Sequence, residues 1–170
     1  MKRVKSLIFI SLVITGVFIT SCNKKIPAFP KELTSYLPYT EGQELVFKDG
    51  ENNEIKFTIS KIDISKEGSY RKCTKCAWSP YMRFETVSNT ANYMYGELFA
   101  NVNNLQIGIS VRNHFYSDSI NCDPFAPNAV AVIGDTIKIL NKNGEEAVVV
   151  VKGKGIVKFT EGTVVWSLAE

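Results

Sequence analysis

Three cysteines and one histidine are the residues of this 170-residue chain best suited to thiol or metal chemistry: Cys73, Cys76, Cys122 and His114. Cys73 and Cys76 have the spacing of redox pairs, in which a helix start stabilises the first thiolate. All four could also form a Cys₃His zinc site. No βαβ pattern surrounds the pair, and His114 and Cys122 are not at a paired-ligand spacing. A redox or metal-dependent enzyme using Cys73 and Cys76, or His114, is therefore an alternative hypothesis.

Other catalytic arrangements are incomplete. His114 is the only histidine, with Asp118 four residues on, but no Gly-x-Ser-x-Gly elbow supplies a serine nucleophile. Glu85 and Glu97, on predicted neighbouring strands, could pair as glycosidase carboxylates. Charged residues on the solvent face of a strand are common, however, so these observations favour a protein that is not an enzyme.

Aromatic residues concentrate in the middle third of the chain, and most of them should be core. The mixed alternation of residues 81–88 and 92–100 nevertheless predicts that some rings lie on a second, outer face. Trp78, Tyr81, Tyr93 and Tyr95 form the predicted binding surface. An exposed aromatic face suits a protein partner, a glycan or an apolar ligand.

Short β-strands must position these residues, because apolar alternation dominates and no long helical pattern occurs. Leu105, Ile107, Ile109 and Val111 alternate with Gln106, Gly108, Ser110 and Arg112, which is the clearest half-buried strand. The other predicted strands are 45–48, 54–60, 81–88, 92–100, 136–140, 147–151, 156–159 and 164–168. About ten strands at hairpin spacing predict one antiparallel all-β domain, as a barrel or a two-sheet sandwich.

Local signals refine this prediction. The apolar phase slips between Ile59 and Ile62, which predicts a bulge near Ser60-Lys61. Asn143-Gly144 between apolar runs predicts a hairpin turn with two left-handed residues.

Residues 31–37 could form a short helix that ends before Pro38. Residues 117–128, with two prolines and Cys122, are expected to be a loop.

The first 21 residues have the pattern of a secretory signal: Lys2, Arg3 and Lys5 precede an apolar run from Leu7 to Ile19. This run of thirteen residues extends only about 20 Å as a helix, which is too short for a permanent membrane span. We expect residues 1–21 to be cleaved, residues 22–30 to be a tether and residues 31–170 to be the globular domain. Cleavage reduces the net charge of +3 to zero, which gives no support for nucleic-acid binding.

Ile19-Thr20-Ser21-Cys22 resembles the lipobox of bacterial lipoproteins. The resemblance implies that Cys22 carries a diacylglycerol on its thiol and an acyl chain on its amine. Membrane lipid bound through Cys22 would then be the first partner, with no other cofactor implied.

Two further stretches extend this resemblance. Together with the lipobox, residues 36–43 (YLPYTEGQ) and 153–159 (GKGIVKF), followed by Trp166-Ser167-Leu168, look like small outer-membrane lipoproteins of Bacteroidota. Members displayed on the cell surface tend to have acidic residues after the lipid cysteine, whereas Asn23-Lys24-Lys25 follow here. The resemblance therefore implies an outer-membrane lipoprotein whose domain faces the periplasm.

Export also governs the remaining thiols. Cys73, Cys76 and Cys122 are an odd number in an oxidising compartment, which predicts one disulfide and one free thiol. We expect Cys122 to pair with Cys73 or Cys76, because the longer loop is stabilised more by a cross-link. The favoured hypothesis is a non-enzymatic lipoprotein that binds a partner or a ligand at the envelope. A purely structural envelope component is the third hypothesis.

Overall fold

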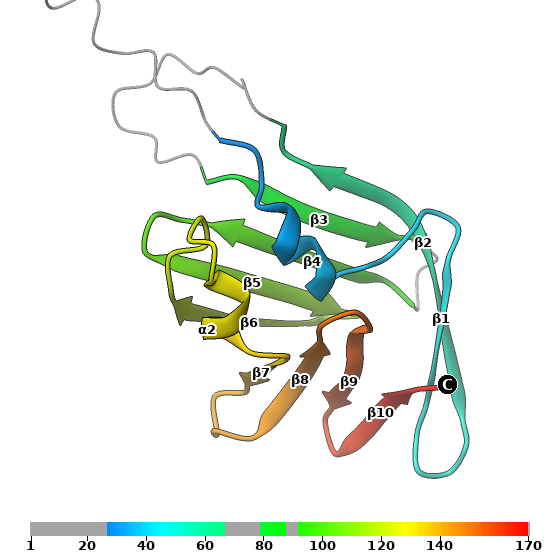
Figure 1. Cartoon of the computed structure of the whole chain (residues 1–170). Helices are drawn as coiled ribbons and strands as arrows, with labels where there is room; N and C mark the ends of the chain where they lie inside the picture. Colours follow the sequence, from blue (N-terminus) through cyan, green and yellow to red (C-terminus); the bar gives the residue numbers. More distant parts are fainter. Residues whose placement is uncertain (1–26, 67–78, 88–91, 170) are drawn as a thin grey trace, which may run out of the picture.

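The computed structural model of the chain describes residues 27–66, 79–87 and 92–169. Ten antiparallel strands form one nearly closed, barrel-like sheet (Figure 1). The strands are β1 Glu44–Lys48, β2 Glu54–Ile64, β3 Tyr81–Thr86, β4 Met94–Ala100, β5 Asn104–Val111, β6 His114–Asn121, β7 Thr136–Leu140, β8 Glu146–Val151, β9 Gly155–Glu161 and β10 Val164–Leu168. A 3₁₀-helix, η1 Lys31–Tyr36, precedes them, and a single-turn helix, α2 Ala129–Ile133, lies between β6 and β7.

The strand order shows how the sheet curls. It runs β6-β5-β4-β3-β2-β1-β10-β9-β8-β7, so two meanders, β1–β6 and β7–β10, are joined where β1 pairs with β10. The two edge strands, β6 and β7, approach each other and leave the one discontinuity in this sheet. The all-β prediction is confirmed, and the barrel-like arrangement is the correct one of its two alternatives.

Apolar alternation builds the interior. Leu105, Ile107, Ile109 and Val111 of β5 are all buried, as their alternation predicts. A cluster of aromatic rings from four strands fills another part of the interior, with centroid separations of 5.0 to 6.2 Å: Phe47, Phe57, Phe159 and Trp166. The barrel interior is thus a packed hydrophobic core.

Two local predictions are confirmed and one is partly wrong. The register of β2 against β3 shifts between Ile59 and Lys61, which is the predicted bulge. Residues 141–145 connect β7 and β8 as a hairpin around Asn143-Gly144. Only Gly144 of these two residues has a positive φ, +82°, so the turn does not have two left-handed residues.

The predicted loop at residues 117–128 is wrong in its first part. β6 continues to Asn121, because it pairs with β5 along its whole length, from Val111↔His114 to Asn104↔Asn121. Every residue of β6 is half-buried or exposed. The strand is thus specified by backbone pairing with its neighbour, and its own side chains give no apolar alternation to predict it.

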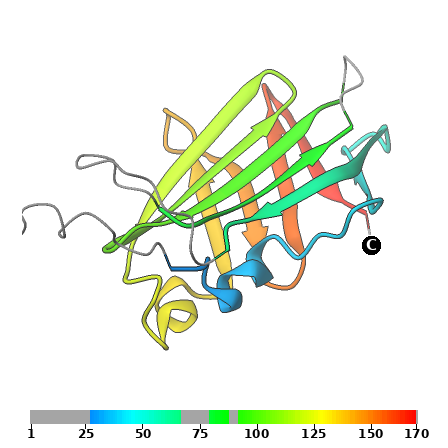
Figure 2. The ribbon, with the colours of Figure 1, turned by 90° about the horizontal axis from the view of Figure 1, so that it is seen from above.

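One end of the barrel is covered by η1, whose Leu33 and Tyr36 are fully buried. The Phe29 N–H donates to the Ser65 carbonyl where the chain enters this end. Figure 2 shows η1 (blue) at this end of the barrel. We call it the tether end; it also carries the β4–β5 turn (101–103), the β6–β7 connection (122–135) and the β8–β9 turn (152–154). The far end carries the turns at 49–53, 112–113, 141–145 and 162–163. Among the described residues, no helix is both long and apolar enough to cross a bilayer.

Candidate binding surface on the outer sheet face

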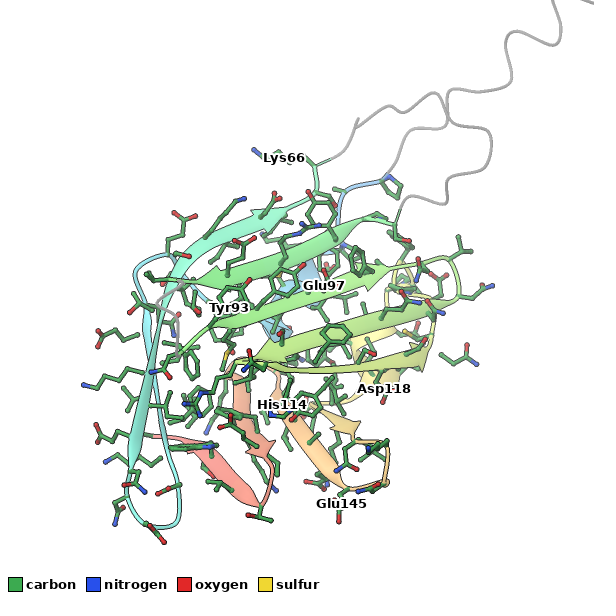
Figure 3. All side chains as sticks on the ribbon, turned by 180° about the vertical axis from the view of Figure 1, so that it is seen from behind. Lys66, Tyr93, Glu97, His114, Asp118 and Glu145 are labelled. Carbon is green, nitrogen blue, oxygen red and sulfur yellow. The ribbon has the colours of Figure 1, made fainter. Side chains whose placement is uncertain are left out.

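Strand alternation brings most of the predicted surface residues to one face. Tyr81 of β3 and Tyr95 of β4 alternate with buried neighbours and are half-buried on the outside of the sheet. Tyr93 is also half-buried, on the same side of the chain as Tyr95. Figure 3 shows Tyr93 and Glu97 on this side of the barrel. Trp78 lies outside the described residues.

The register of β3 against β4 sets which side chains touch. Tyr81 faces Phe99, and their ring centroids are 6.3 Å apart. Arg83 faces Glu97, and its guanidinium lies 4.2 Å from the centre of the Tyr81 ring. This is a cation–π contact on the surface of a sheet. Aromatic and charged side chains are therefore packed together here.

Hydrogen bonds hold the tyrosine hydroxyls. The Tyr95 Oη–H donates to the Glu97 carboxylate, and burial together with that carboxylate raises the pKa of Tyr95. The Tyr81 Oη–H donates to Asp63 Oδ2 at 3.0 Å, and this bond raises the pKa of Tyr81. Burial raises the pKa of Tyr93, with a smaller effect from Glu85. All three side chains thus stay neutral phenols at physiological pH.

Sequence reasoning missed Arg83, Phe99 and Phe115 on this face, and Phe115 is the most exposed of the three. It lies on β6, and 62% of its surface is exposed. A Cβ built on Gly108 would lie 3.2 Å from Phe115 Cζ and 3.3 Å from Glu97 Cγ. The ring therefore lies against the backbone of β5 and beside Glu97. A glycine on the polar side of the β5 alternation was the only signal of this close approach.

Arg83 has spare hydrogen-bonding capacity. Its Nε is buried and has no hydrogen-bond partner among the residues that the structure describes. The facing Glu97 accepts a hydrogen bond from Tyr95. Burying a donor without a partner is unfavourable.

The carboxylates Glu85 and Glu97 lie on this same face. Glu85 faces Tyr95 and Glu97 faces Arg83, so the two are diagonal neighbours across β3 and β4. Both are half-buried on the outer surface of the sheet. They lie beside the aromatic rings of this candidate surface, and their pairing as glycosidase carboxylates stays a prediction.

The thiol and imidazole residues that the structure describes do not converge. His114 is the first residue of β6, and Cys122 follows its last residue, so their Cα atoms are about 26 Å apart at about 3.3 Å per residue. They cannot bind one ion. Within residues 27–66, 79–87 and 92–169, no group of three or more His, Cys, Asp or Glu side chains could hold a metal.

His114 also has no triad geometry with Asp118. Its ring stacks on Tyr116, with centroids 6.3 Å apart, while Asp118 accepts a hydrogen bond from the Ser119 N–H at 2.7 Å. Four residues along a strand separate the two Cα atoms by about 13 Å. Figure 3 shows the two side chains at separate positions along β6.

Cys122 lies at the tether end. Its thiol is buried and has no disulfide partner within the described residues, and burial raises its pKa. Cys73 and Cys76 lie outside the described residues, so the predicted disulfide stays a prediction.

No protein-family model, curated protein or solved structure matches this chain. The resemblance to small outer-membrane lipoproteins of Bacteroidota therefore stays a prediction, as does lipid attachment at Cys22, which lies outside the described residues.

Proposed function

We propose that this chain is a lipid-anchored envelope lipoprotein whose barrel is a non-enzymatic module that binds a protein partner. The partner binds the outer aromatic face, which we define as Tyr81, Arg83, Tyr93, Tyr95, Glu97, Phe99 and Phe115. The observation that carries the proposal is the Phe115 ring, which is mostly exposed and lies against Gly108 beside Glu97. Leaving a large apolar ring in water is unfavourable unless something covers it.

The composition of this face favours a protein. Tyrosine and arginine are enriched among the residues that dominate the energy of protein interfaces, and here they are held in place before binding. The guanidinium of Arg83 is fixed over the Tyr81 ring, 4.2 Å from its centre. A partner carboxylate beside an apolar side chain would fit this arrangement. The packed interior offers less support for an apolar ligand inside the barrel.

The sequence supports the anchor and the location. Cys22, at the end of a short apolar signal, is the proposed site of the diacylglycerol and the N-acyl chain. The proposed location is the outer membrane, with the barrel facing the periplasm, because Asn23-Lys24-Lys25 follow Cys22 in place of an acidic run.

Cross-linking in intact envelopes, followed by affinity recovery of the tagged chain, tests the binding proposal. Phe115→Ala and Arg83→Ala should each lower recovery of a specific partner at least tenfold, since hot-spot truncations cost about 2 kcal/mol or more. Val165→Ala is the matched control, because Val165 is also an exposed apolar residue but lies on β10. Equal recovery by all three variants would contradict the proposal.

Gly108→Ala provides a second, subtler test. The added methyl would push the Phe115 ring and the Glu97 side chain away from the sheet without removing either one. We expect weaker partner recovery with a nearly unchanged melting temperature. Recovery of purified envelope polysaccharide in place of protein would assign the face to a glycan.

A further inference from the structure

The two edges of the sheet differ in how well they are protected against pairing with another strand. β7, at one edge, is five residues long, carries Lys138 and has a register shift between Ile139 and Leu140. Short length, lysine and a bulge all hinder edge-to-edge pairing. β6, at the other edge, is eight residues long, pairs with β5 in unbroken register and contains no lysine, arginine or proline. β6 is therefore the edge that is open to a further strand.

The register of β6 against β5 shows which main-chain groups face outward. Val111 and His114 close the hairpin across a two-residue turn, so these two residues exchange both of their hydrogen bonds. Bonded and non-bonded pairs alternate along an antiparallel ladder, so the main-chain groups of Phe115, Ser117 and Ser119 point away from β5. Among the described residues, no backbone bond connects these groups to another strand. Such a row of donors and acceptors matches the backbone of another extended chain.

Asp118 already occupies one of these outward donors. The Ser119 N–H donates to Asp118 Oδ1 at 2.7 Å. Asp118 is the one acidic residue of β6, and a charged side chain on the core side of an edge strand hinders pairing. It protects the second half of the strand and leaves the main-chain groups of Phe115 and Ser117 without that protection.

Contacts with β9 place the start of β6 away from β7. The Tyr116 hydroxyl donates to the Thr160 carbonyl of β9 at 2.8 Å, and Arg112, in the turn before β6, pairs with Glu161 of β9 at 2.6 Å. β6 thus starts over β9, which is two strands from β7 in the sheet order. Figure 3 shows β6, with its labelled His114 and Asp118, as the last strand of the green group.

We infer that the protein partner of the outer aromatic face binds through an extended segment, which adds a strand to β6 at residues 115–117. This inference rests on the proposed binding of a protein to that face. Phe115 belongs to both surfaces, because its ring lies over Gly108 on the outer face while its main chain forms the open edge. A β-branched or aromatic side chain of the added strand, opposite Phe115 on the same face, would cover the ring.

A second copy of the chain fits this edge less well. Two identical β6 strands related by a twofold axis would pair antiparallel, which points the tether ends of the two barrels in opposite directions. Phe29, seven residues after Cys22, enters at the tether end. One proposed lipid anchor would then lie on the side away from the membrane that holds the other. An extended segment of a different protein has no such constraint.

Photo-crosslinking in intact envelopes tests the added strand. The full chain carries a benzophenone amino acid at Phe115, Ser117 or Ser119, which are exposed positions on the outer side of β6. We expect adducts with one protein, at partner residues that shift by two for each shift of two along β6. Opposite residues stay opposite along a ladder, so this step identifies paired strands. Adducts at scattered partner residues, adducts with a second copy, or no adducts would overturn the inference.

Ser117→Pro provides a second test. It removes an outward N–H and keeps the bonds between β6 and β5, which is the position in an edge strand where proline is tolerated. We expect at least tenfold lower partner recovery with a melting temperature within a few degrees of the unsubstituted chain. Ser117→Thr is the matched control, because it keeps the N–H and favours a strand, and it should keep full recovery.

Comparison with the face variants separates this inference from the proposed function. Lower recovery with Phe115→Ala and Arg83→Ala, but full recovery with folded Ser117→Pro, would keep the face and overturn the added strand. Lower recovery with Ser117→Pro alone would keep the main-chain pairing and overturn the face. Full recovery with all three variants would overturn both.

Discussion

The hydroxyl of Tyr39 packs directly against Gly155. A Cβ built on Gly155 would lie 2.3 Å from Tyr39 Oη and 2.5 Å from Tyr39 Cζ, closer than real Cβ atoms approach any neighbour. The same oxygen accepts a hydrogen bond from the Ile156 N–H at 2.6 Å, and the Tyr39 ring packs edge-on against Phe84. This contact joins the segment before β1 to the start of β9, so that the β7–β10 meander is attached to the first half of the chain.

Gly155→Ala should therefore destabilise the domain strongly. Its φ of +82° is unfavourable for alanine by about 1–2 kcal/mol, and overpacking a buried ring costs a further 1–3 kcal/mol or so. Urea denaturation should show a loss of about 2–4 kcal/mol. Gly162→Ala is the matched control, because Gly162 has φ +62° but no atom within 4 Å of its Cβ position. Its loss should be only about 1 kcal/mol, and equal losses would contradict the steric argument.

High pH should unfold the domain through the same tyrosine. Burial raises the pKa of Tyr39 well above its ordinary value of about 10. In the unfolded chain the Tyr39 phenol loses its proton near pH 10. In the folded domain the same phenol stays protonated at that pH. The unfolded state therefore binds fewer protons above pH 10, and the free energy of unfolding falls as pH rises. Below pH 10 Tyr39 is protonated in both states, so its stabilising contribution to the free energy of unfolding is fully present.

Denaturation curves between pH 8 and 11 measure this effect. Tyr39→Phe should be less stable at pH 8 by about 1–3 kcal/mol, because the buried Ile156 N–H loses its acceptor. Its stability should nevertheless fall less steeply above pH 10 than that of the unsubstituted chain. Parallel curves for the two proteins would show that another group controls the alkaline transition.

The strands that face the core on one side could be predicted from the sequence, and the edge strand could not. β5 alternates between apolar and polar residues, since its inner face lies in the core and its outer face does not. The bulge after Ile59 left a visible slip of phase. β6 has polar residues on both faces and is held by its pairing with β5, which is a contact between segments and leaves no local pattern.

The residues of the candidate surface also fall into a group that the sequence could predict and a group that it could not. An outer position for Tyr81 and Tyr95 followed from mixed alternation, which is a local property. The position of Phe115 over Gly108, and of Arg83 opposite Glu97, depends on the register between strands. Register is set by turns and by the whole core, so no single stretch of sequence contains it.

Lipid attachment at Cys22 can be tested by metabolic labelling. Cells given a radioactive fatty acid should incorporate label into the unsubstituted chain, and Cys22→Ala should abolish that label and leave the longer precursor. Ser21→Ala is a suitable control, because it keeps a small residue beside the cysteine. Normal labelling of Cys22→Ala would show that the lipobox was misread.

The last prediction concerns the disulfide. Cys122 follows β6 at the tether end, and the segment that carries Cys73 and Cys76 leaves the described structure at Lys66 and rejoins it at Ser79, both at that same end. Two strands, β4 and β5, lie between β3 and β6. Three inter-strand spacings of about 4.8 Å therefore separate β3 from β6 by about 14 Å, which a twelve-residue segment can span. A bond between Cys122 and one of the pair would close a loop of nearly 50 residues, worth about 4 kcal/mol.

Alkylation with and without prior reduction counts the thiols. We expect one free thiol in the oxidised, unfolded mature chain and three after reduction, with peptide mapping to name the pair. Cys122→Ser should lower the melting temperature of the oxidised protein and leave that of the reduced protein less affected. Loss of one cross-link from a domain of this size should shift the melting temperature by several degrees. Three free thiols before reduction would show that Cys122 is a buried core thiol with no covalent partner.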